Sequence, residues 1–424
     1  LAISKIFVYS RRFFRIIGFV LLAYIAVLLG VYPTLINNTF DFWFTFALIA
    51  AMGLSQLGQY FIGVSYQLLL SSDQKSYVQL IVNGSTLLLN TIMSVVLMVS
   101  GANIQFVKLT TSIIYLLRPL AMYLYVKRNY ILDRSAPIDK SAIPQKRNGI
   151  VQHIAYMVYS NTDVMVLTFF STLQNISIYS VYVLVTNSIK QIITAATTGV
   201  QSLFGNMIAR NETDKLKAVY SIYSWGIHTL CTILFTITGI MIVPFVQIYT
   251  FGITDANYNV PLFALLITIA YFFDSIRNCQ YVLIRAAGHF KRTQTASLIE
   301  CVLNLSISIT LVSFLGLTGV AIGTIAATVF FVVYEMFYFK KNIVFVPIKQ
   351  ALKQFFVDAF IVGATVIIAL QIHLFTGNIG SWILQAMAIT LICLAISGLG
   401  QLIFYRNHVK AIFKKVASKL KKAY

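Results

Sequence analysis

The feature that most constrains this chain is a series of long apolar blocks, of which Ile16–Gly30 is an uninterrupted example. A strand buried in a soluble protein needs about 4 to 8 apolar residues, whereas a transmembrane helix needs roughly 20. Strands of outer-membrane barrels alternate in polarity at every second residue, and these blocks do not. Only 10% of the 424 residues are charged and 58% are hydrophobic. The sequence therefore predicts an all-α polytopic membrane protein and excludes soluble enzymes, disordered chains and barrels.

The apolar runs and the polar breaks between them predict twelve transmembrane helices. Several runs exceed 25 residues, which indicates helices that tilt or extend beyond the bilayer. The expected spans cover residues 13–36, 42–70, 77–99, 104–126, 150–172, 177–204, 218–248, 259–284, 295–315, 317–338, 355–376 and 381–405.

Lys and Arg are distributed unevenly between the two sides that these spans define. Of the 32 basic residues, 28 fall on the side that holds the N-terminus, four lie within spans, and the opposite connections carry none. Cytoplasmic loops of membrane proteins carry such an excess of Lys and Arg. We therefore expect both termini of the chain to be cytoplasmic. The net charge of +20 then needs no nucleic-acid partner.

The longest polar connection, residues 127–149, is expected to be a cytoplasmic linker between two helical lobes. Four spans precede it within residues 1–126, six follow within 150–338, and two trailing spans lie within 339–405. Transporters built from repeats usually have equal halves, so this count suggests that two spans precede the first residue. The apolar segment Leu1–Tyr9 is interpreted as the end of such a preceding span.

The sequence shows no catalytic or metal-binding motif. It lacks a glycine-rich phosphate loop, a nucleophile elbow and a His/Glu metal motif, and its four cysteines lie within apolar blocks without metal-ligand spacing. The chain is therefore not expected to be an enzyme or to hold a metal or cofactor, and any energy must come from an ion gradient (H⁺ or Na⁺) or the substrate.

The basic tail, residues 406–424, is expected either as an interfacial helix on membrane lipids or as a solvated tail.

Charged residues deep within expected spans are costly, and they mark functional sites by default. Arg118 and Lys190 have no opposite charge within their own spans, so each needs a cavity, an acid on another helix or an anionic substrate. Asp274 and Arg277 are one helical turn apart and form either a structural ion pair or part of a site. Asp163 is either a partner of Lys190 or Arg277, or a group that binds a coupling ion.

Other intramembrane charges are expected to be peripheral. Lys108 is expected to extend outward to the interface, and Glu300, Glu335 and Asp358 are expected to be solvated or paired with lysine near cytoplasmic helix ends. The remaining deep charges are three basic and two acidic. This balance favours an anionic substrate, and arginine suits bidentate contact with phosphate.

Several segments resemble the polysaccharide flippase family of the multidrug, oligosaccharidyl-lipid and polysaccharide exporter superfamily. Their order and spacing along the chain carry the resemblance more than any single motif does. The matching segments are Thr162–Leu167 followed by Ile178–Ser180, then Ala209–Glu212, Arg285–Lys291, Asn304 and Gly316–Ala327.

The resemblance implies a two-lobed bundle with six spans per lobe and two trailing spans, of which this chain lacks the first two. It implies a multi-pass protein of the bacterial inner membrane. Such proteins use alternating access to move undecaprenyl-pyrophosphate-linked oligosaccharides to the external leaflet, for O-antigen or capsule synthesis, alongside other polysaccharide-assembly proteins. Arg118, Lys190 and Arg277 then become the candidate cationic, diphosphate-binding residues, with Asp163 and Asp274 as candidate ion-coupling residues or charge partners.

Three alternatives remain open at this stage. A drug exporter of the same superfamily predicts a cavity dominated by acidic residues. A membrane glycosyltransferase or polymerase predicts a catalytic acid or histidine in a sizeable external loop. A scaffold that has lost transport predicts an incomplete lobe.

Overall fold

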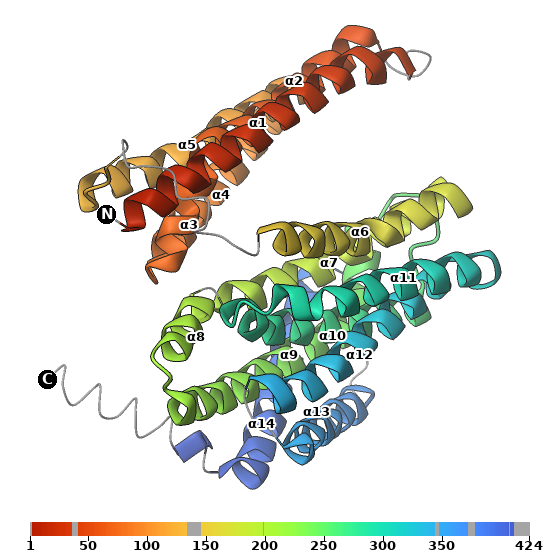
Figure 1. Cartoon of the computed structure of the whole chain (residues 1–424). Coiled ribbons are helices and arrows are strands. Elements are labelled where there is room, and N and C mark those ends of the chain that lie inside the picture. Colours follow the sequence, from red (N-terminus) through yellow and green to blue (C-terminus); the bar gives the residue numbers. More distant parts are fainter. Residues whose placement is uncertain are drawn as a thin grey trace, which may run out of the picture. The chain divides into compact units, whose positions relative to one another are not determined.

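The computed structural model describes residues 2–35, 41–133, 146–197, 199–343, 347–371, 378–406 and 408–410. All regular elements in these ranges are helices, as the apolar blocks predict. The chain divides into two compact units, Leu1–Pro144 (unit 1) and Gln145–Tyr424 (unit 2), which Figure 1 shows coloured along the sequence. The division falls within the segment expected to be a linker, residues 127–149.

Unit 1 is a small bundle in which α5 packs against α2 and α4, and α1 packs against α2 and α3. A π-helical turn, η1, joins α2 to α3. One expectation is wrong here: Leu1–Tyr9 is not the end of a separate span, because α1 continues without a break from residue 2 and buries Phe7 and Tyr9. The elements are α1 (Ala2–Leu35), α2 (Phe42–Gly58), η1 (Gln59–Gly63), α3 (Val64–Ser72), α4 (Ser76–Val99) and α5 (Ile104–Asn129).

Unit 2 is built around α10, which packs against α7, α8, α9 and α12. Helix α11 packs against α6 and α12, and the pair α13 and α14 packs on α9. Gly199, at a φ of 90°, separates α7 from α8 within the expected span 177–204. The elements are α6 (Lys146–Phe170), α7 (Leu173–Thr197), α8 (Val200–Ala209), α9 (Thr213–Tyr249), α10 (Pro261–Ala286), α11 (Phe290–Leu315), α12 (Leu317–Asn342), α13 (Ile348–Ala369) and α14 (Ile379–Phe404).

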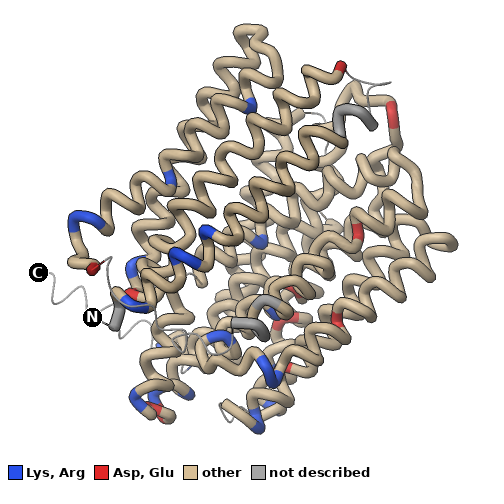
Figure 2. The backbone as a smooth tube through the Cα atoms, turned by 45° about the horizontal axis from the view of Figure 1, so that its top comes forward, with Lys and Arg blue, Asp and Glu red and all other residues tan. Residues whose placement is uncertain are grey.

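Eleven stretches of helix among the described residues are long and apolar enough to cross a membrane. The one expected span that is not among the eleven covers residues 150–172. It is present as helix α6, but polar residues such as Asn161 and Asp163 interrupt its apolar sequence. Most Lys and Arg lie at helix ends in Figure 2, and only a few lie along the helices. The basic tail expected at 406–424 lies almost entirely outside the described residues.

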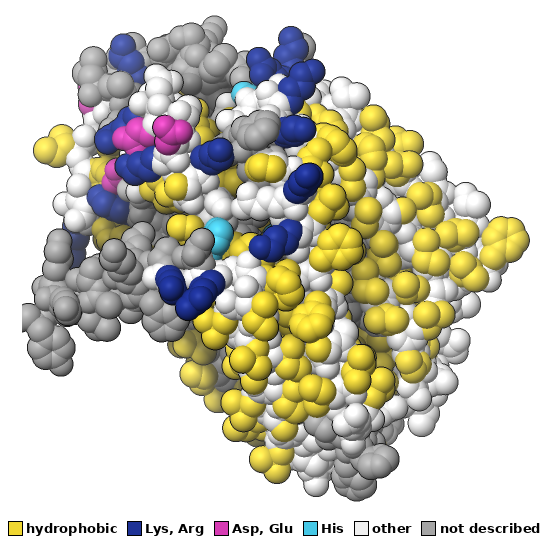
Figure 3. Space-filling model, turned by 90° about the horizontal axis from the view of Figure 1, so that it is seen from below, with side chains coloured by type: hydrophobic (Ala, Val, Ile, Leu, Met, Phe, Trp, Pro, Cys, Tyr) yellow, Lys and Arg dark blue, Asp and Glu magenta, His cyan; other side chains and the backbone are white. Residues whose placement is uncertain are grey.

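The outer surface of unit 2 carries many exposed apolar side chains. They include Phe356 and Phe360 of α13, and Leu384 and Leu391 of α14. Figure 3 shows a broad hydrophobic face with Lys and Arg gathered along one side of it. A surface of this kind suits contact with the hydrocarbon interior of a membrane. The helices suit it as well, because each one satisfies its own backbone hydrogen bonds.

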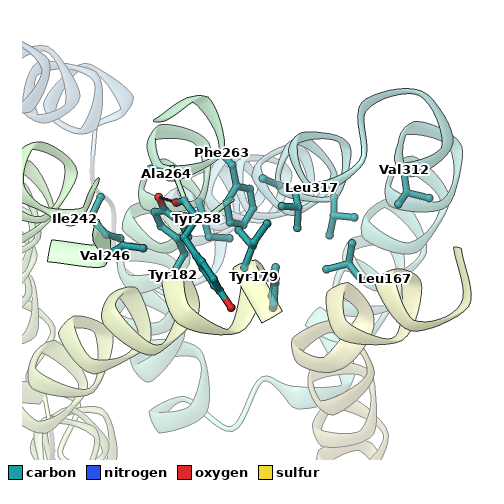
Figure 4. Packing of buried hydrophobic residues seen from close by; sticks show 14 of the residues in the cluster. Leu167, Tyr179, Tyr182, Ile242, Val246, Tyr258, Phe263, Ala264, Val312 and Leu317 are labelled. Atoms are coloured by element: carbon teal, nitrogen blue, oxygen red, sulfur yellow. Dashed lines mark hydrogen bonds between the residues drawn. The ribbon is translucent and has the colours of Figure 1, made fainter. Parts of the chain in front are cut away.

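The interior of unit 2 is held by aromatic and aliphatic packing near one end of α7 and α10. Figure 4 shows Tyr179 and Tyr182 of α7 against Phe263 of α10, with Leu317 of α12 nearby. The hydroxyl group of Tyr182 donates to the backbone oxygen of Tyr258 at 2.8 Å, so its polar end is satisfied although the ring is buried. This core fixes the helices that carry the buried charges.

Glycines let α11 and α12 approach closely. A Cβ atom added to Gly319 would lie 2.5 Å from the carbonyl oxygen of Leu311, and one added to Gly323 would lie 2.9 Å from the backbone nitrogen of Ser308. Small residues spaced by four favour such crossings in membranes. The close approach brings polar groups of both helices to one position beside α6.

Candidate functional site

A cluster of buried charges lies at the middle of α10. Asp274 and Arg277, one helical turn apart, form an ion pair in which Nη2 of Arg277 lies 2.7 Å from Oδ1 of Asp274. The other oxygen of Asp274 pairs with Nζ of Lys190, which comes from α7. On α11, Oε1 of Glu300 lies 3.2 Å from Nε of Arg277. Four side chains from three helices therefore form one alternating chain of cations and carboxylates.

Aromatic rings of α6 and α12 surround the arginine in this cluster. The guanidinium carbon of Arg277 lies 5.3 Å from the ring centroid of Tyr156, 5.1 Å from that of Tyr159 and 5.6 Å from that of Phe331. Arg277 is only 3% exposed. Rings at this distance favour a cation, and pairing with two carboxylates offsets part of the cost of burying it. The cluster is thus a buried network that needs all its members.

Asp163 of α6 forms a separate polar cluster with α11 and α12. Oγ1 of Thr324 lies 2.9 Å from each carboxylate oxygen of Asp163, and Nδ2 of Asn304 donates to the same Thr324 oxygen at 3.0 Å. The hydroxyl group of Tyr179 donates to Asp163 at 3.0 Å. Oδ1 of Asn304 is buried and has no hydrogen-bond partner among the described residues. Among the described residues, Asp163 pairs with neither Lys190 nor Arg277. The other interpretation, that Asp163 binds a coupling ion, stays a prediction.

Arg118 belongs to unit 1, where its partners are neutral. Its Nε donates to Oγ1 of Thr86 at 2.7 Å, and its guanidinium carbon lies 3.9 Å from the ring centroid of Tyr115. The side chain is partly exposed. The structure thus places Lys190 and Arg277 in one cluster and Arg118 in the other unit.

The expectation for the three acids near helix ends is wrong. Glu300, Glu335 and Asp358 are at most 3% exposed. Glu300 pairs with Arg277, and Asp358 pairs with Nδ1 of His228 at 2.7 Å. The reason is that charged and polar residues continue the helices past the apolar runs, so Glu300 lies ten residues into α11 and not near its end. The small basic excess counted from the sequence therefore does not hold within unit 2.

The described residues contain no group of three or more His, Cys, Asp and Glu side chains able to hold a metal ion. Both clusters contain charged side chains that can exchange their present partners for a bound ion or substrate. Lys190, Arg277 and Asp274 can exchange contacts with an ionic substrate, while Asp163 and its neighbours supply several oxygen atoms to a small cation.

No protein-family model matches the sequence, and curated protein sequences give no match. Solved structures do match. The Vibrio cholerae MATE transporter VcmN, in its bent form, aligns with a TM-score of 0.56 and 12% identity over 79% of this chain and 82% of that one. The lipid II flippase MurJ, in its inward closed conformation, aligns with a TM-score of 0.54 and 16% identity over 95% of this chain and 84% of that one. This chain has the fold of these transporters.

A third structure is an outward-facing multidrug resistance MATE family transporter of the MOP superfamily. It aligns with a TM-score of 0.55 and 15% identity over 79% of this chain and 77% of that one. The all-helical, two-lobed fold class expected from the sequence is thereby confirmed.

Proposed function

We propose that this protein is a flippase of the bacterial inner membrane that moves oligosaccharides linked to undecaprenyl pyrophosphate from the cytoplasmic to the external leaflet. The diphosphate–sugar head cannot cross hydrocarbon unaided, whereas the polyprenyl tail can remain in it. A cavity that alternates between the two sides moves the head while the tail stays in lipid.

The observation that carries the proposal is the cluster of partly exposed Lys190 with buried Asp274, Arg277 and Glu300, in a fold shared with a lipid II flippase. A structural ion network of this depth is expensive in a membrane, and hydrophobic residues would pack the same space at lower cost. The tyrosines beside it offer ring faces and hydroxyl groups suited to sugars. Arg118 supplies a cation in unit 1 whose partners are uncharged.

For the energy source, we propose that Asp163 binds the coupling cation, a proton or sodium. Carboxylate, hydroxyl and amide oxygens are the ligands that small hard cations prefer, and Asp163, Thr324 and Asn304 bring them together. We expect Asp163→Asn to abolish the dependence of transport on the gradient, whereas Asp255→Asn, in the connection before α10, preserves it. Varying sodium at fixed pH, and pH at fixed sodium, identifies the ion. Gradient-driven transport that persists in Asp163→Asn would contradict this role.

Complementation tests the flippase function. The gene and its variants are expressed in a strain that lacks its own polysaccharide flippase, and surface polysaccharide is measured together with protein abundance. We expect restoration by the unaltered protein, loss in Arg118→Ala and Lys190→Met, and restoration by Lys108→Met, which changes an exposed intramembrane lysine. Full activity of the first two variants at normal abundance would show that these cations do not bind substrate.

A drug exporter of the same fold is the second candidate, and one observation favours it. Asp163, Asp274, Glu300 and Glu335 are all buried in unit 2, and a cavity dominated by acids suits cationic compounds. Resistance of the complemented strain to cationic dyes, without restored polysaccharide, would favour this function over flipping.

A further inference from the structure

A polar cavity lies in unit 2, at the end of α10 where α6 and α11 begin. Its volume is about 190 Å³, and its lining includes Gln152, His153, Arg277, Tyr281 and Arg285. It shares Arg277 and Glu300 with the buried charge cluster but extends away from Asp274, toward the last turn of α10. No contact in the proposed mechanism uses Arg285.

The walls of this cavity are held in place by hydrogen bonds. Gln152 is only 4% exposed, and its Nε2 donates to Oγ1 of Thr293 at 2.7 Å and to the carbonyl oxygen of Phe290 at 2.8 Å. Its Oε1 accepts from the hydroxyl group of Tyr281 at 2.5 Å. The ring of Tyr281 is thereby fixed, and the guanidinium carbon of Arg285 lies 5.3 Å from its centroid.

Arg285 differs from Arg277 in its partners. Nε of Arg285 is buried without a hydrogen-bond partner, and Arg285 forms no ion pair within the described residues. Glu300, the carboxylate in the cavity lining, lies 3.2 Å from Arg277 and is paired with it. A buried donor left unpaired is costly and calls for a ligand that completes it. A stacked guanidinium with free donors suits the oxygens of a phosphate group.

The position and size of the cavity fit such a ligand. Arg285 lies in the last turn of α10, and only the turn around Gly288 separates it from Phe290, where α11 begins. Arg285 therefore lies near the end of α10, eight residues along the helix from Arg277. Its volume of about 190 Å³ is more than ten times the roughly 10–15 Å³ that a cavity needs to hold one water molecule. That is room for a diphosphate.

We propose that this cavity is a binding site for anions of the phosphate and diphosphate class, with Arg285 as the principal ligand and Arg277 beside it. The natural ligand, the diphosphate of a lipid-linked oligosaccharide, rests on the proposed function. The site would hold the head at the end of the helices before it moves past Lys190 and Asp274.

Direct binding tests the site without transport. Inorganic pyrophosphate is titrated into the purified protein in nanodiscs made of zwitterionic lipid, and binding is followed by calorimetry. We expect saturable binding that weakens at least about tenfold in Arg285→Gln, because a hydrogen bond to a charged group is lost. Arg285→Lys keeps the charge without the planar fork and should lie between the two. Arg210→Gln, at the exposed end of α8, should bind as the unaltered protein does.

Thermal unfolding shows whether Arg285→Gln remains folded, so a loss of binding can be assigned to the site. Pyrophosphate that does not bind at millimolar concentration, or binds equally to Arg285→Gln, overturns the proposal. Nanodiscs that contain phosphatidylglycerol separate the two sources of the bound phosphate. If the lipid competes with pyrophosphate, the occupant is a lipid phosphate; if the lipid does not compete, the occupant is the diphosphate head. Complementation without pyrophosphate binding would refute this site alone, whereas binding without complementation would refute flipping alone.

Discussion

Replacing Asp274 by Asn is the most informative perturbation of the buried charge cluster. Asp274 is the only described carboxylate that contacts both Lys190 and Arg277. Asn has nearly the same shape, so the change removes charge and leaves packing almost unaltered. It leaves Lys190 without its carboxylate partner and Arg277 with Glu300 alone.

The magnitude follows from burial. Removing one partner of a buried ion pair costs about 3–5 kcal/mol, because an uncompensated charge stays inside. The exposed pair formed by Lys215 and Glu212 at the start of α9 provides a matched control. Removal of the Glu212 charge by Glu212→Gln should leave stability nearly unchanged, because solvent screens a surface pair.

Unfolding can be followed with a dye that reacts with thiols, because Cys231, Cys279 and Cys393 are buried. We expect Asp274→Asn to be several kcal/mol less stable than Glu212→Gln in the same detergent. The double variant Lys190→Met with Asp274→Asn should recover part of the loss, because an apolar side chain replaces the unpaired lysine. Equal stability of Asp274→Asn and Glu212→Gln would refute the buried network.

Three further predictions concern stability. Gly323→Ala should cost about 1–3 kcal/mol of stability, because the added Cβ overlaps Oγ of Ser308. Gly363→Ala in α13, where nothing lies within 4 Å of the added Cβ, should be neutral or gain up to about 1 kcal/mol. Equal effects of the two changes in thermal unfolding would contradict the close crossing of α11 and α12. Glu335→Gln should change stability by less than about 1 kcal/mol, because neither carboxyl oxygen of Glu335 has a hydrogen-bond partner to lose among the described residues. A loss of stability as large as that of Asp274→Asn would contradict this and reveal a missed partner. Burial, and to a smaller extent the charge of Arg292, lower the pKa of His289 from its ordinary value of 6.5. Stability should therefore fall as the pH drops below about 6.5, because the unfolded chain takes up the proton more readily. His289→Gln should flatten this decline, and an unchanged pH profile in that variant would contradict the role of His289.

The sequence predicted the helical architecture well because apolar length decides it. Each of the twelve expected spans corresponds, within the described residues, to a single helix or to joined helical stretches such as α2, η1 and α3. The π-helical turn at Gln59–Gly63 has no recognisable pattern in the sequence. Helix ends were less predictable. Polar residues such as Thr213–Lys217 continue α9 beyond the apolar run, because a helix ends where its backbone partners end and not where hydrophobicity ends.

The charge cluster was only partly predictable. The spacing of Asp274 and Arg277 indicates an ion pair as one of two alternatives, because residues three apart share a helix face, and the structure shows that pair. Contacts between helices cannot be read from one sequence, so the acid that pairs with Lys190 was left open. Glu300 is expected from the sequence to be solvated or paired with lysine, because its helix is expected to begin five residues later than it does. Thr324 gave no signal, since a lone threonine in an apolar helix has no distinguishing pattern.

The most direct test of the central claim is a flipping assay in proteoliposomes. Purified protein is reconstituted with a fluorescent oligosaccharide linked to undecaprenyl pyrophosphate, and the fraction accessible to an external glycosidase is followed after an ion gradient is imposed. The account predicts a gradient-dependent increase in accessibility that is lost in Lys190→Met and retained in Lys108→Met. Accessibility no greater than in protein-free liposomes, from protein shown to be folded, would contradict it.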